Sequence, residues 1–180
     1  KAPLLDHLIE LRSRLLKSLV AFVICFAIAF TQSSRIFGFL VQPLVKAYGD
    51  GVVGKLIYTK LYEAFFVEVK VAAFAAICMA FPIIANQLWA FVAPGLYRKE
   101  KRAFLPFLFA TPVLFTMGAS LAYFVVMPVA FSFFLGFQSS SEITGISQEA
   151  LPAMGEYLDL VMNMILGFGV AFLLPVLLML

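Results

Sequence analysis

Long apolar runs separated by short polar segments are the main pattern along this chain of 180 residues. A helix needs about 20 mostly apolar residues to cross a hydrocarbon core roughly 30 Å thick. The pattern therefore predicts four membrane-spanning helices, at residues 15–33, 67–87, 104–127 and 157–180. Between them, residues 42–55 (QPLVKAYGDGVVGK) and 139–157 (SSSEITGISQEALPAMGEY) are rich in turn-forming residues and are predicted to be loops, the second leading into a helix. We expect an all-α, polytopic helical membrane protein with a single membrane domain over residues 1–180.

The third apolar run, from Ala103 to Phe137, has no charged residue and is too long for one upright span. We expect it to continue beyond its span as a buried or interfacial segment. Five prolines lie within the apolar runs: Pro82, Pro106, Pro112, Pro128 and Pro175. Membrane helices tolerate proline where neighbouring helices satisfy the freed carbonyls, so these residues predict kinked or tilted helices around a concave face.

The composition supports the same fold class. Hydrophobic residues make up 63% of the chain and aromatic residues 16%, which is more apolar surface than a soluble core of this length can bury. Cys25 and Cys78 lie in separate apolar runs without metal-ligand or redox spacing, so we interpret them as small hydrophobic residues. The sequence has no nucleophile–base pair, paired histidine ligands or glycine-rich phosphate loop. We therefore expect no enzyme, metal site or cofactor, and no nucleic-acid partner.

The placement of charge predicts the topology, because Lys and Arg in short loops favour the cytoplasmic side. Basic residues gather in residues 1–17 and 98–102, whereas the segment between the third and fourth spans has only acidic residues. We expect the N-terminus and the loop at 88–103 to be cytoplasmic, and residues 34–66 and 128–156 to be extracytoplasmic. The first of these outer segments also contains basic residues, but longer loops follow the rule less strictly.

The N-terminal stretch PLLDHLIELRSRLLKSL is predicted to be a helix with one apolar stripe, because leucines recur at a spacing of three or four residues. Glu10 has two interpretations. It can pair with Arg14 at i+4, a contact of about 0.2 to 0.5 kcal/mol, or it can bind a ligand. His7 has no second ligand nearby and is expected to be exposed or interfacial.

A second acid, Glu100, stands among four basic residues in APGLYRKEKRAF. Lys99 and Lys101 can simply offset its charge at a solvated surface. Alternatively, Glu100 binds a cation while the basic side chains point elsewhere, for example toward anionic lipid headgroups. Asp159 and Asn163 are four residues apart and mark either a polar pathway or a first helical turn near headgroups, of which we favour the second.

Two motifs, HLIELRSRL (7–15) and QLWAFVAPGLYRKEKR (87–102), together resemble the TatC family, the multi-pass receptor subunit of the twin-arginine protein translocase. The resemblance covers nearly the whole chain and continues through Gln42–Leu44, Tyr62–Phe65 with Lys70, Ala122–Val125 with Pro128, and Phe168–Gly169 with Pro175. It implies a fold of six spans, of which four are present here, so we expect the C-terminal part of the family fold to be missing. The family usually has a polar residue two positions before the last proline, where this chain has Leu173.

The resemblance also implies a function. A TatC protein is a receptor in the bacterial inner membrane that binds twin-arginine signal peptides. It works in an oligomeric complex with single-span TatA and TatB subunits, and the proton motive force drives the export of folded proteins. The family motifs imply these residues for signal-peptide binding: Glu10, Glu100, Arg12, Phe91, Pro94 and Leu96. Three more match loop or span positions of structural or functional importance: Pro43, Glu63 and Lys70.

Elementary chemistry agrees with that implied role. An arginine guanidinium engages a carboxylate through two parallel hydrogen bonds that lysine cannot reproduce, so two arginines favour two acceptors, here Glu10 and Glu100. A hydrogen bond to a charged group contributes about 1.5 to 3 kcal/mol, enough to discriminate Arg-Arg from Lys-Lys. The main alternative is a secondary transporter of a small solute, which the scarcity of ionisable residues within the spans disfavours. A purely structural membrane scaffold is a third possibility.

Overall fold

The computed structural model describes residues 2–51, 54–92, 101–138 and 145–178, and their regular structure is helical apart from one isolated β-bridge. This confirms the predicted all-α class. The helices are α1 (Ala2–Thr31), α2 (Ser33–Tyr48), α3 (Glu63–Val92), α4 (Lys101–Leu121), the π-helical turn η3 (Ala122–Val126), α5 (Met127–Leu135), α7 (Met154–Ala171) and α8 (Leu174–Leu178).

Among the described residues, four helical segments are long and apolar enough to cross a membrane: Pro3–Thr31, Glu63–Val92, Leu108–Leu135 and Met154–Val176. They overlap the four predicted segments, but several helices extend further than the apolar runs. α1 begins at Ala2 because the amphipathic N-terminal stretch continues into the apolar run without a break. The long third run forms α4, η3 and α5, which follow one another without a gap. The π-helical turn η3 joins the two α-helices.

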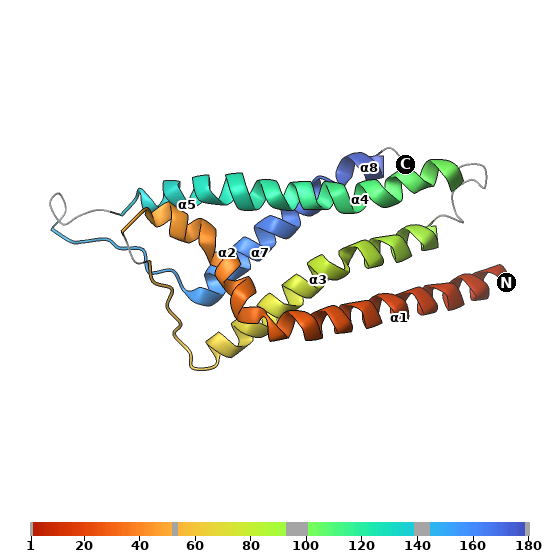
Figure 1. The fold of residues 1–180 in the computed structure, drawn as a ribbon, viewed down its shortest axis with the longest axis horizontal. Coiled ribbons are helices and arrows are strands. Elements are labelled where there is room, and N and C mark those ends of the chain that lie inside the picture. The colour runs from red at the N-terminus through yellow and green to blue at the C-terminus, as the bar shows by residue number, and fades with distance from the viewer. Residues whose placement is uncertain (1, 52–53, 93–100, 139–144, 179–180) are drawn as a thin grey trace.

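Figure 1 shows α1 and α3 side by side and antiparallel, with α4 and α5 along the opposite side of the molecule and α7 crossing diagonally between the two layers. The N-terminus of α1, the C-terminal end of α3 and the N-terminal end of α4 lie at one end of the molecule. The start of α3, the end of α5 and the start of α7 lie at the other. Glu10, near the start of α1, and Phe91, near the end of α3, therefore lie at the same end of the molecule.

The predicted loop at residues 42–55 is wrong for residues 42–48, because α2 continues as a helix to Tyr48 with Pro43 inside it. Pro43 has no N–H, so it leaves the carbonyl of Phe39 without its usual helical donor. The hydroxyl of Tyr123 donates a hydrogen bond to that carbonyl instead. Tyr157 donates to the next carbonyl, that of Leu40, at 2.9 Å. Donors from η3 and α7 thus allow a proline-containing helix where local sequence favours a turn.

The core lies where α2, α3, η3, α5 and α7 meet. Its most deeply buried side chains include Leu40, Val71, Met127 and Leu158. Close packing between α4 and α7 requires glycine: a Cβ at Gly118 would lie 2.3 Å from the backbone oxygen of Phe168. Small residues at such crossings let helix backbones approach closely, as is common in membrane proteins.

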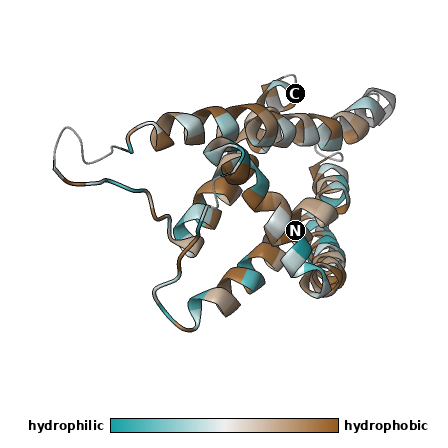
Figure 2. Ribbon diagram, turned by 60° about the vertical axis from the view of Figure 1, so that its left-hand side comes forward, coloured by the Kyte–Doolittle hydropathy of each residue, from teal (hydrophilic) through white to brown (hydrophobic). Residues whose placement is uncertain are grey.

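α1 packs against α3 but is otherwise exposed. The predicted leucine stripe lies on the exposed part of this helix, since Leu4, Leu8 and Leu15 are 66%, 52% and 60% exposed. Figure 2 shows that hydrophobic residues make up much of the helical ribbon, and the exposed leucines of α1 give it an apolar surface. A surface of this kind suits contact with lipid, where the side chains need no protein partner.

The polar segments at the far end are tied together. Ile57 and Ala153 form a parallel bridge in which the N–H of Met154 donates to the carbonyl of Ile57 at 2.7 Å. Tyr48 donates to the carbonyl of Ala150 at 3.5 Å, and burial raises the pKa of its phenol. These contacts hold the segment that precedes α3 against the segment that precedes α7.

Candidate functional site

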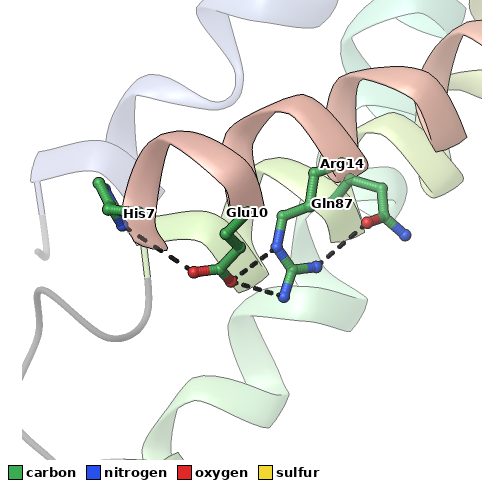
Figure 3. Close-up of polar contacts among 4 residues, drawn as sticks. All are labelled: His7, Glu10, Arg14 and Gln87. Atoms are coloured by element: carbon green, nitrogen blue, oxygen red, sulfur yellow. Dashed lines mark hydrogen bonds and ion pairs between the residues drawn. The ribbon is translucent and has the colours of Figure 1, made fainter. Parts of the chain in front are cut away.

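A polar cluster joins α1 to α3 near the N-terminal end of the chain (Figure 3). Glu10 and Arg14 lie one turn apart on α1, so both project from the same face of the helix. Arg14 donates a hydrogen bond through Nε to the Oε1 atom of Glu10 at 2.9 Å, and its Nη2 lies 2.9 Å from the same oxygen in an ion pair. Its Nη1 donates to Oε1 of Gln87 on α3 at 3.1 Å. The guanidinium therefore bridges a carboxylate on one helix and an amide on the other.

His7 completes the cluster one turn before Glu10. Its ring stacks on that of Phe91 with 4.2 Å between ring centroids and an angle of 20° between the planes. Its Nδ1 lies 3.9 Å from Oε2 of Glu10, an ion pair only when the imidazole is protonated. The side chain of Glu10 is 33% exposed and that of Arg14 is 26% exposed, so solvent reaches both.

The structure tests only part of the predicted site. Glu10 and Phe91 belong to one cluster, connected through His7. Arg12 is exposed and makes no ion pair within the part of the chain that the structure describes. Three more of the predicted residues, Pro94, Leu96 and Glu100, lie outside the described residues.

Three residues of the cluster, His7, Arg14 and Gln87, were not among the predicted ligand-binding positions. Arg14 was expected only as the i+4 partner of Glu10, and that pairing is confirmed. Gln87 begins the second family motif, but nothing in its local sequence indicates a contact with α1. Two adjacent amides, Asn86 and Gln87, near the end of an otherwise apolar run are the signal that could have identified it, because an amide in that setting needs a polar partner.

Glu63 and Lys70, the loop and span positions, take part in contacts at the opposite end of the molecule. Glu63 accepts the N–H of Thr59 at 3.0 Å through Oε2 and the N–H of Gly155 at 3.2 Å through Oε1. Lys70 lies 3.4 Å from Asp159, which places an ion pair between α3 and α7. These contacts connect the starts of two helices, so the residues have an evident structural role.

The remaining polar candidates do not gather into a second site within the described residues. Within the described residues, no group of three or more His, Cys, Asp or Glu side chains could hold a metal ion. Asp159 pairs with Lys70 and Asn163 is exposed, so they form no shared polar cluster. Leu173 lies in the turn between α7 and α8, and its side chain supplies no polar group at the family's usual position.

Comparison with known proteins gives a consistent picture. A family model for the Sec-independent protein translocase protein (TatC) matches residues 6–180. The TatC protein of Magnetococcus marinus is 52% identical over 176 residues, which are 98% of this chain and 62% of that protein. The TatC protein of Rickettsia prowazekii is 44% identical over 171 residues, which are 95% of this chain and 67% of that protein.

Solved structures agree in fold. A crystal structure of the twin arginine translocase receptor TatC superimposes with a TM-score of 0.81 at 36% identity, covering 96% of this chain and 73% of that one. A second crystal structure of the same receptor gives a TM-score of 0.80. The chain thus spans 62% of the length of the Magnetococcus relative and corresponds to most of the solved receptor.

Proposed function

Because the chain belongs to the TatC family, we propose that it acts in a bacterial inner membrane as the receptor for twin-arginine signal peptides. Glu10 and Glu100 bind the two adjacent arginines of the peptide. The protein has no chemistry of its own in this role. It presents carboxylates at the membrane surface to a ligand whose guanidinium groups match them in charge and shape.

The observation that carries this proposal is the state of Glu10. Its Oε1 already lies 2.9 Å from two nitrogens of a guanidinium and accepts a hydrogen bond from one of them. Within the described residues its Oε2 has only His7 at 3.9 Å. A carboxylate that holds one guanidinium in this geometry, and remains partly exposed, has the chemistry needed to hold another.

The arrangement of the helix ends supports a shared site for the two acids. Phe91 stacks on His7 and so fixes the end of α3 beside the turn of α1 that carries Glu10. Glu100 immediately precedes Lys101, the first residue of α4, and α4 begins at the same end of the molecule (Figure 1). The basic residues of the same two segments favour the cytoplasmic side, where a signal peptide first meets the membrane.

The wider role follows from the family. The chain works with single-span subunits of the TatA and TatB type in an oligomeric complex, and the proton motive force drives the export of folded cargo. The N-terminus is cytoplasmic. The exposed apolar face of α1 and the deeply packed α2, α3 and α7 then give the receptor a lipid-facing side and a rigid frame.

Peptide binding to membrane vesicles that contain the full chain tests the proposal. A labelled Arg-Arg signal peptide should bind, and Glu10→Gln or Glu100→Gln should each weaken binding about tenfold, as expected for loss of one charge-assisted contact at a partly exposed site. Glu149→Gln, the same change at the opposite end of the molecule, should leave affinity unchanged. Full binding by both site variants, together with uptake of a small solute into the vesicles, would support the transporter instead.

A further inference from the structure

We infer that Arg14 is an intramolecular competitor of the signal peptide, occupying Glu10 until a peptide arginine displaces it. The inference rests on the proposed function. Arg14 presents to Glu10 the same functional group that a twin-arginine peptide carries, at hydrogen-bond distances of 2.9 Å. A peptide guanidinium that seeks the same oxygen therefore meets an occupied acceptor.

Gln87 distinguishes this contact from an ordinary helix-surface ion pair. An exposed i,i+4 pair is held by one helix alone and fluctuates readily. Here the third nitrogen of Arg14 donates to Gln87 on α3, so the guanidinium is held from two helices (Figure 3). The side chain of Arg14 is 26% exposed, less than that of Glu10. The competitor is thus held in place, while its acceptor stays accessible.

The same amide makes exchange feasible. When a peptide guanidinium takes Oε1 of Glu10, Arg14 loses its hydrogen bond and its ion-pair contact with the carboxylate but can keep its bond to Gln87. The peptide supplies two equivalent bonds, so the number of charge-assisted contacts at Glu10 is conserved. Binding then depends on what the peptide contributes elsewhere, including its second arginine.

A competitor of this kind sets a threshold of affinity. If Arg14 occupies Glu10 most of the time, Glu10 is vacant for only a small fraction of the time. The apparent affinity of every cationic ligand is then its intrinsic affinity multiplied by that fraction. The factor is the same for Arg-Arg and Lys-Lys peptides, so their ratio is unchanged. The weaker lysine ligand, however, falls below a useful affinity first. Arg14 therefore raises the intrinsic affinity that any ligand needs in order to bind, without changing the ratio between the two peptides.

The test is peptide titration against the full chain in membrane vesicles, with labelled Arg-Arg and Lys-Lys peptides. Arg14→Met keeps an unbranched stem and good helix propensity but removes every donor. It should tighten binding of both peptides by the same factor, about twofold to tenfold. The matched control is Lys17→Met, which removes one positive charge from an exposed position one turn further along α1 and should change neither affinity.

Three outcomes would overturn the inference while leaving the receptor function intact. Weaker binding by a folded Arg14→Met protein would make Arg14 part of the peptide site. Unchanged binding would mean that the peptide uses Oε2 of Glu10 beside Arg14. Equal tightening by Lys17→Met would reduce the effect to general repulsion between cations.

Two further variants keep the test decisive. Arg14→Lys retains the charge but not the forked guanidinium, so it should raise peptide affinity by less than Arg14→Met does. This variant can still be measured if Arg14→Met fails to fold. A loss of peptide affinity in Arg14→Lys would again contradict competition. In a Glu10→Gln background, Arg14→Met should give no gain, because nothing remains to compete for. If Glu10→Gln alone has no effect on peptide affinity, it is the proposed function that fails.

Discussion

Replacing Tyr123 by phenylalanine should destabilise the fold through one unsatisfied carbonyl. The Tyr123 hydroxyl donates to the carbonyl of Phe39, which has no helical donor because Pro43 lacks an N–H. The phenylalanine ring keeps the stacking on Phe39, at 4.4 Å between centroids and nearly parallel, so only the hydrogen bond is lost. Tyr123 is 7% exposed, and a buried acceptor left without a donor costs about 1 to 3 kcal/mol.

A double-mutant cycle with Pro43→Ala isolates that cause. The alanine restores an N–H that can donate to Phe39, although removing two ring methylenes of the buried proline costs up to about 1.5 kcal/mol. The loss of unfolding free energy caused by Tyr123→Phe should therefore be smaller, by at least about 1 kcal/mol, in the Pro43→Ala background than in the wild type. Detergent-solubilised protein, unfolded by denaturant and followed by circular dichroism, gives the four free energies of unfolding. Tyr58→Phe, at an exposed tyrosine, should stay within about 0.5 kcal/mol of wild type, and strictly additive losses in the cycle would refute the reasoning.

Gly118→Ala should lower the unfolding free energy by about 1 to 3 kcal/mol because its Cβ meets backbone that cannot move, whereas Gly167→Ala, with open space around it, should cause no loss in the same unfolding assay. Glu63→Ala should speed hydrogen exchange at the first amides of α7, since the carboxylate is their link to α3; unchanged exchange there would remove its structural role. Losses of signal-peptide affinity for Glu10→Ala and Glu100→Ala, measured singly and together, should be non-additive because both acids hold one ligand. Additive losses would argue for two separate sites.

Much of the fold could be predicted because a bilayer imposes a simple condition on sequence. A chain that crosses hydrocarbon must satisfy its backbone within helices, so each long apolar run indicates a helix. Helix α2 was missed because Pro43 and the glycines that follow it are local turn signals. What overrides them are hydroxyl donors from Tyr123 and Tyr157, which lie far along the chain and become neighbours only in the folded protein.

In the candidate site too, contacts within one helix could be predicted from the sequence, whereas contacts between helices could not. The pairing of Glu10 with Arg14 could be predicted because it depends only on helical spacing within one element. The contact of Arg14 with Gln87 and the stacking of His7 on Phe91 could not, because each depends on how α1 is positioned lengthwise against α3. Helix packing admits several such registers, and no local pattern selects among them.

The two interpretations of Glu10, ion-pair partner and ligand-binding group, are compatible once the empty site is considered. A carboxylate on a helix surrounded by apolar surface is costly without a partner, and Arg14 supplies that partner while no peptide is bound. The contact that stabilises the empty receptor is then the one that a ligand must replace, so the net binding free energy is a difference between two similar arrangements. Such a site binds moderately and releases readily, as a receptor that must hand its ligand on to a transport step requires.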